Sequence, residues 1–527
     1  MTKKMNNSKK SNNGKKNSSL LVSNQIILIA EGLLVGAEAG LVALLYRLLL
    51  DKSGIIRNKI IHWAKGDSLK MGIWFLIILA CGYVIYRLVK YEPMISGSGI
   101  PQLEGEIQGA LEENWRKVLP VKFIGGLLGV FSGLALGREG PSIQLGAMVG
   151  KLTGKGLKKG KTREKFLLTC GASAGLSAAF HAPLAGVMFS LEEVHKNFNV
   201  SLLIGVMSSS LMADFIASKV FGLSAVFSFE VVKDIPHKSY LLLILLGAIL
   251  GVLGAFYNWF TLKVQSLYQE AKFIPEGLKM MIPFVAAGIL AFTMPSLLGS
   301  GHNLLEDLTT KPMTVSMVFI ILIGRFVFSA VSFGSGAPGG IFFPLLVIGG
   351  YIGGAFALLI DPAYLSNFVI LAMAGYFAAI VRAPLTGIIL IFEMTGSLTQ
   401  MMSLSLVSIV AYVVATLMKS KPIYESLLER LLKRQEKEID PLNAKTGEKK
   451  VLSYFTIELG SSLEGNRIRE ISWPKCSLIV SIERGSNEII PNGESHLLVG
   501  DTMVVMCSEG DYQYVTEEIG RLTGSRW

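Results

Sequence analysis

Charged residues are scarce in this chain: they make up 17% of 527 residues, against roughly 25% in soluble domains. The four cysteines, Cys81, Cys170, Cys476 and Cys507, are scattered without a CxxC pair, so we expect no disulfide framework and no metal site. The six histidines form no HExxH pair, which argues against zinc hydrolase chemistry. We also find no early apolar segment with a cleavage site, and therefore expect no secretory signal peptide.

Hydrophobic residues are correspondingly abundant, at 51% of the chain. Several uncharged runs approach the roughly 20 residues that cross a bilayer as a helix. Examples are Leu241–Phe260, Met281–Ser300 and Gly396–Met418. The 56 glycines suit close contact between membrane helices. The composition predicts an all-α polytopic protein of the cell membrane over residues 24–436.

The net charge of +11 is concentrated in short basic segments. Six lysines lie within Met1–Ser19, and a second cluster occupies Lys155–Lys165. Cytoplasmic loops of membrane proteins carry such an excess of lysine and arginine. We therefore expect a basic, disordered, cytoplasmic N-terminus over residues 1–23, and no nucleic-acid partner.

Three glycine-framed loops each lead into a proline that can open a helix. They are Gly97–Pro101, Gly137–Pro141 and Gly334–Pro344. Unpaired N–H groups at helix N-termini attract anions. They do so without a buried cation, which would hold a conducted anion too tightly. If the three helix ends converge, they predict an anion site inside the membrane domain.

The polar side chains near these loops each allow two readings. Ser98 and Tyr424 can donate hydroxyl hydrogen bonds to an anion, or serve as a helix N-cap and an interfacial anchor. Glu139 is either a capping residue or a titratable gate that competes with the anion for N–H groups and leaves them when protonated. Glu193 is either a second proton carrier or a charge at a helix end.

The chain also contains an internal repeat. The matching segments are Ala182–Gly186 with Ala383–Gly387, Glu192 with Glu393, Gly137–Pro141 with Gly340–Pro344, and Gly97-Ser98-Gly99 with Gly334-Ser335-Gly336. Duplicated halves with broken helices predict a transporter fold of two inverted repeats, with the site at their interface. The halves would cover about 24–220 and 237–436.

The composition changes past about Pro441. Val451–Ile457, Leu478–Glu483 and Thr502–Cys507 alternate like strands, and Gly485–Gly500 carries turn signals. Asp511–Leu522 is a short helix candidate. Residues 445–527 are therefore expected to form a small cytosolic α+β domain on the same side as the N-terminus.

Taken together and in order, the three glycine-framed loops and Tyr424 resemble the CLC family of chloride channels and chloride/proton exchangers, over roughly residues 25–434. The resemblance implies a homodimer with one anion pathway per subunit, and bound chloride without any cofactor. It implies chloride ligands from the hydroxyls of Ser98 and Tyr424 and the N–H groups of Ile341 and Phe342.

The resemblance also assigns proton-transfer roles. Glu139 corresponds to the external gate, and Glu193 corresponds to the internal proton-transfer glutamate of exchangers. The other selectivity-filter positions are Gly97, Gly99, Pro101, Gly137, Arg138, Gly140, Pro141, Gly340, Phe343 and Pro344.

These roles imply a coupled chloride/proton antiporter, because channel members often lack a carboxylate at the position of Glu193. A passive voltage- or pH-gated chloride channel of the same fold is the alternative. A serine hydrolase built on Ser98 and His181 is disfavoured, since Ser98 lies in GSG and not in a GxSxG elbow. We therefore expect no enzyme activity and no catalytic residue.

The tail resembles the TrkA-C (RCK-C) regulatory lobe of bacterial potassium-transport subunits. The resemblance rests on Ser462–Asn466, Arg484-Gly485, Pro491–Glu494 and Gly500-Asp501. Such lobes dimerise and bind small ligands, which makes cyclic di-AMP a candidate nucleotide ligand here. The alternative is a folded tail that only supports the dimer.

Overall fold

The computed structural model describes residues 2–524 apart from 197, 223–225, 228, 230–234, 237–238, 272, 397–399, 440–449, 459, 486 and 509–510. Side chains of residues 2–24 and 436–439 also lie outside the description. The chain divides into two units, Met1–Leu432 and Lys433–Trp527.

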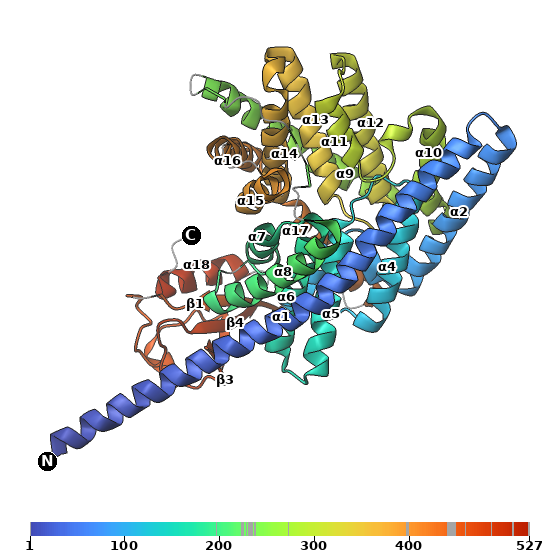
Figure 1. Cartoon of the computed structure of the whole chain (residues 1–527). Helices are drawn as coiled ribbons and strands as arrows, with labels where there is room; N and C mark the ends of the chain where they lie inside the picture. Colours follow the sequence, from blue (N-terminus) through green and yellow to red (C-terminus); the bar gives the residue numbers. More distant parts are fainter. Residues whose placement is uncertain are drawn as a thin grey trace. The chain divides into compact units, whose positions relative to one another are not determined.

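The larger unit is helical, and its order of elements occurs twice (Figure 1). The first half contains α1 (Thr2–Ala64), α2 (Ser68–Tyr91), η1 (Pro93–Ile95), α3 (Ile100–Gln108), α4 (Trp115–Phe131), α5 (Glu139–Gly156), α6 (Lys161–Phe180), α7 (Pro183–Phe189), η2 (Ser190–Val194) and α8 (Val200–Phe221). The second contains α9 (Tyr240–Glu270), α10 (Glu276–Thr293), η4 (Pro295–Leu297), α11 (His302–Thr310), α12 (Val315–Gly334), α13 (Phe342–Ile360), η5 (Pro362–Tyr364), α14 (Leu365–Val381), α15 (Pro384–Thr395) and α16 (Met401–Leu417). Helices α1 to α8 thus correspond in order to α9 to α16, and α17 (Ile423–Ile439) follows.

Reciprocal hydrogen bonds show that the two halves are related by a local two-fold axis. The N–H of Gly137 donates to the carbonyl of Gly340 at 2.7 Å, and the N–H of Gly340 donates to the carbonyl of Gly137 at 2.8 Å. The two glycines precede α5 and α13, and their bridge is antiparallel. Equivalent residues exchange contacts in this way across a two-fold axis. The predicted duplication is confirmed.

One predicted pairing within the repeat is wrong. The counterpart of Gly97-Ser98-Gly99, which precedes α3, is Gly299-Ser300-Gly301, which precedes α11. The outer glycines have left-handed φ angles of 64° and 91° in the first loop, and of 72° and 96° in the second. Gly334-Ser335-Gly336 instead ends α12, as Phe131–Gly133 ends α4. The sequence Gly-Ser-Gly occurs twice in the second half, so only its position relative to the helices shows which copy is equivalent to Gly97-Ser98-Gly99.

Eight helices in the described residues are long and apolar enough to cross a membrane. Helix α1 lies along α4, α5, α6 and α8 (Figure 1). Helices α5 and α6 meet at glycines: a β-carbon on Gly146 would lie 2.2 Å from the carbonyl oxygen of Gly171. Only glycine permits so close an approach of two helix backbones.

The start of α1 differs from the prediction. The helix begins at Thr2, where the sequence predicts a disordered segment over residues 1–23. This segment contains no proline, the residue that interrupts a helix most strongly.

The smaller unit contains a four-stranded antiparallel sheet in the order β1-β4-β2-β3. Its elements are β1 (Lys450–Thr456), η6 (Ile468–Glu470), β2 (Ser477–Arg484), β3 (Asn487–Ile489), β4 (Thr502–Ser508) and α18 (Tyr512–Thr523). Val515 and Ile519 of α18 join Phe455, Met503 and Val505 in one buried core. The predicted strands and helix agree to within a residue or two, but β3 lies where only turn signals were expected.

Candidate anion site

The Ser98 loop is held against the second repeat. The N–H of Gly97 donates to the carbonyl of Gly336 at 3.3 Å, and the N–H of Gly339 donates to the carbonyl of Gly97 at 2.9 Å. Ser98 is buried, and its Oγ accepts from the N–H of Ile100 at 3.3 Å. The N-cap of α3 is Gly99, so the serine lies one residue before the cap, and its hydroxyl can still donate its hydrogen to an anion.

A buried lysine that the sequence analysis missed fixes this loop. Lys122 on α4 is fully buried, and its Nζ donates to the carbonyls of Ile95 at 2.8 Å and Gly97 at 2.7 Å. In the second repeat, Arg325 on α12 donates to the equivalent carbonyls, those of Leu297 at 2.9 Å and Gly299 at 2.7 Å. A cation at matching places of α4 and α12 was the available signal in the sequence, but Arg116 and Lys117 at the start of α4 obscure it.

Glu139 is the first residue of α5, and it is 1% exposed. A β-carbon on Gly137 would lie 2.3 Å from its Oε2, so the carboxylate uses space that only glycine leaves open. The nitrogen of Phe343 lies on the same side, 3.2 Å from that built β-carbon of Gly137. Arg138 Nε lies 3.9 Å from Glu139 Oε1, while Arg138 Nη1 pairs with Asp51 at 2.9 Å.

The structure brings the three loops together. A β-carbon on Gly140 would lie 2.9 Å from Cβ of Ser98, and one on Gly340 would lie 3.1 Å from the nitrogen of Gly140. Ile341 and Phe342 stand at the start of α13 and are fully buried. The N–H groups in the first turn of a helix have no acceptor within it. The N–H groups of Ile341 and Phe342 therefore need acceptors from outside α13.

The three prolines lie inside the first turns of their helices. Pro101 is the second residue of α3, while Pro141 and Pro344 are third in α5 and α13. The prediction that each proline is the first helical residue is thus off by one or two positions. Proline is tolerated there because the first N–H groups of a helix are unpaired in any case.

Tyr424 lies near the start of α17 and is fully buried, which excludes the interfacial reading. Its hydroxyl has no hydrogen-bond partner among the described residues. Oε2 of Glu139 and Oε1 of Glu193 are likewise buried and have no partner in the described part of the chain.

The neighbouring acids Glu192 and Glu193 differ in their surroundings. The carboxylate of Glu192 accepts from the N–H groups of Leu385 at 3.2 Å and Thr386 at 2.7 Å. Glu193 is 4% exposed, and within the described part of the chain its Oε1 has no partner. Glu193, the predicted residue, is thus the acid of this pair with an uncommitted oxygen.

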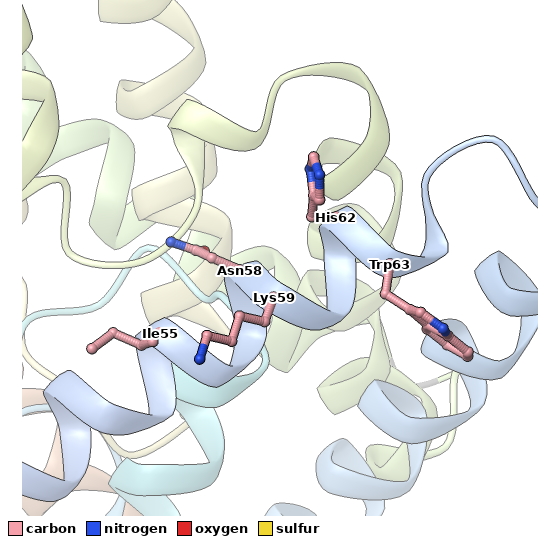
Figure 2. Close-up of a pocket in the computed structure, with 5 residues that line it drawn as sticks. All are labelled: Ile55, Asn58, Lys59, His62 and Trp63. Carbon is pink, nitrogen blue, oxygen red and sulfur yellow. The ribbon is translucent and has the colours of Figure 1, made fainter.

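An open hollow on α1 is separate from this site. Figure 2 shows its lining residues, Ile55, Asn58, Lys59, His62 and Trp63, all on one helix. It contains none of the predicted site residues.

Two repeats of broken helices whose glycine-rich ends meet at one buried point define an ion-transport protein of the membrane. Comparison with known protein families supports this class: the family described as voltage gated chloride channel matches residues 75–416. This chain belongs to that family, the CLC family. The TrkA-C domain family matches residues 452–520, so the chain also carries the predicted tail domain.

Individual proteins of the CLC family are similar to this chain in sequence and in structure. The chain is 35% identical over 424 residues to the H(+)/Cl(−) exchange transporter ClcA of Vibrio campbellii (strain ATCC BAA-1116), covering 76% of this chain and 89% of the relative. It is 36% identical over 428 residues to the protein of the same name from Vibrio cholerae serotype O1 (strain M66-2), covering 77% and 89%. The crystal structure of a slow cyanobacterial Cl−/H+ antiporter is similar, with 31% identity, a TM-score of 0.74, and coverage of 78% of this chain and 99% of that one. A eukaryotic CLC transporter shares the fold, with 22% identity, a TM-score of 0.65, and coverage of 77% and 74%.

Proposed function

We propose that this chain is a coupled antiporter that moves chloride across the membrane in exchange for protons. The observation that carries the proposal is a set of three buried groups, the carboxyls of Glu139 and Glu193 and the hydroxyl of Tyr424, each with an oxygen that has no partner among the described residues. A channel needs a gate, but it does not need a second buried carboxyl in addition to that gate. The names of the Vibrio relatives and of the cyanobacterial structure support the same activity.

In this proposal, chloride binds to the hydroxyls of Ser98 and Tyr424 and to the N–H groups of Ile341 and Phe342. Charged Glu139 occupies N–H groups at the start of α13 and so competes with chloride. Protonation removes the charge that those N–H groups stabilise, and the side chain can then leave the site. Glu193 passes the proton between Glu139 and the cytoplasmic side.

The test is a proteoliposome experiment with a chloride gradient and no initial pH gradient. Paired chloride and pH electrodes should record protons moving uphill, in the direction opposite to chloride. The passive channel is the alternative. It would be preferred if chloride moved at a measurable rate while the pH trace stayed flat.

The assembly and the tail are also proposals. We propose a homodimer with both termini in the cytoplasm, where the basic segment Met1–Ser19 is favoured. Cross-linking in native membranes and protease access from each side would test the two points. We further propose that the TrkA-C domain binds a small nucleotide, with cyclic di-AMP as the first candidate. Calorimetry with purified full-length protein would test it, and the absence of heat with every nucleotide would favour a purely supporting role.

A further inference from the structure

An ion pair lies next to the proposed proton-transfer residue. The Nζ of Lys196 donates to Oε1 of Glu104 at 2.5 Å. The lysine side chain is 42% exposed, whereas the glutamate side chain is 1% exposed. Lys196 is therefore the partly exposed partner of a buried carboxylate, and it neutralises a charge that would otherwise be costly to bury.

The backbone holds Lys196 in this place. The π-turn η2 ends at Val194, and Lys196 has a left-handed φ of 51°. This conformation is rare for residues other than glycine, and it turns the chain immediately after the segment that carries Glu193. Lys196 is thus three residues beyond Glu193 and bound to α3 through Glu104.

The charged groups around Glu193 come from several elements. Those that act on it electrostatically are Lys196, Glu104 on α3, Glu192 on η2 and Glu425 on α17, and the phenol of Tyr424 acts as well. Among these described groups, Lys196 is the single cation. Its charge therefore acts against the three surrounding carboxylates as well as pairing with Glu104.

We infer that Lys196 and Glu104 form a charge-compensated pair that sets the pH range over which Glu193 accepts and releases protons. The inference rests on the proposed antiport, and it makes Lys196 a positioning residue, not a proton carrier. The lysine stabilises the carboxylate form of Glu193, while Glu104 cancels part of that effect. Removal of either charge should therefore shift the pH dependence of proton flux, and the two shifts should have opposite directions.

Charge-removing variants distinguish this role from a structural one. Lys196→Met removes the cation, so Glu193 holds its proton to higher pH and the midpoint of proton flux against pH moves in the alkaline direction by roughly one unit. Glu104→Gln leaves the cation uncompensated and moves the midpoint in the acidic direction. The double variant should return close to wild type, and Lys196→Arg should match wild type.

The experiment measures proton and chloride fluxes of full-length protein in proteoliposomes over a series of symmetrical pH values. Lys161→Met is the matched control, because Lys161 is an exposed lysine at the start of α6. Lys196→Gln replaces the Met variant if that one is not monodisperse. Opposite shifts of the two single variants support the inference. Shifts in the same direction, or none, overturn it while antiport stands. A wild type that moves chloride without protons overturns the proposed function and this inference with it.

Discussion

The carboxylate of Glu192 accepts hydrogen bonds from the N–H and the Oγ1 of Thr386, both at 2.7 Å, at the start of α15. Glu393 does the same for α7, where it accepts from the N–H of Ala185 at 2.8 Å. Each repeat thus supplies an acid that caps a helix of the other repeat. The cap is favourable because a helix N-terminus carries unpaired N–H groups and partial positive charge. Glu192 is therefore a clamp between repeats.

This exchange of caps predicts matched losses of stability. Glu192→Ala and Glu393→Ala should each lower the free energy of unfolding by about 1.5–3 kcal/mol, the usual value of hydrogen bonds to a charged group. Thermal unfolding of the purified protein in detergent measures the effect. Glu112→Ala is the control, since Glu112 is an exposed glutamate of the first repeat. Unfolding temperatures equal to that control would show that the caps do not clamp the repeats.

The sequence was sufficient for features that depend on short-range chemistry. Gly137 and Gly340 could be paired by their prolines and their order, and the structure joins them directly. Pro183, within the repeated segment Ala182–Gly186, marks the break between α6, which ends at Phe180, and α7. These predictions succeeded because glycine and proline fix local backbone geometry wherever they occur.

Features that depend on distant contacts were not predictable. Lys122 looked like an ordinary charge in an apolar segment, and only the fold brings the carbonyl of Gly97 to its ammonium. The caps formed by Glu192 and Glu393 require two helices about 200 residues apart in the sequence. Strand β3 has three residues and is defined by its pairing with β2, not by its own composition. Tertiary contacts of this kind override local preference.

Tyr424→Phe should weaken chloride binding by about 10- to 100-fold, because one hydrogen bond to an ion contributes about 1.5–3 kcal/mol. The ring and its packing are retained, so the fold should be unchanged. Isothermal calorimetry with chloride measures the affinity. Tyr376→Phe is the control: its hydroxyl is also buried without a partner among the described residues, and Tyr376 is not one of the proposed chloride ligands. Equal affinities in the two variants would remove Tyr424 from the site.

Residues 445–527 should fold alone, since the smaller unit has its own core around Val505 and Ile519. Its stability should depend on Arg484, whose Nε and Nη2 bind the buried Asp501 at 2.8 Å and 2.7 Å. Arg484→Met should cost about 3 kcal/mol, because it leaves a buried carboxylate without its partner. Urea unfolding followed by circular dichroism measures the loss. Arg521→Met, at an exposed site on α18, is the control and should unfold like wild type. If the wild-type segment 445–527 shows no cooperative unfolding, the domain assignment is wrong.

Glu139→Gln should abolish proton movement and make chloride flux insensitive to pH. Glutamine keeps the size and hydrogen bonding of the side chain, but it does not titrate. The variant therefore resembles a gate that is permanently protonated and displaced from the N–H groups of α13. Chloride efflux from proteoliposomes at several pH values measures both effects. Chloride flux that still varied with pH in this variant would require another gate.

Glu193→Gln separates the two carboxyls. Proton movement should be lost, because the residue proposed to pass protons between Glu139 and the cytoplasmic side no longer titrates. Chloride flux should persist and stay pH-sensitive, since Glu139 is intact and Glu193 does not belong to the proposed chloride ligands. The assay is again paired chloride and pH electrodes on proteoliposomes with a chloride gradient. Glu192→Gln is the matched control. Glu192 is the neighbour of Glu193 in the sequence, but its carboxylate caps α15, so chloride/proton coupling should survive in this variant. If coupling survived in Glu193→Gln and was lost in Glu192→Gln, the proton-transfer role would pass to Glu192.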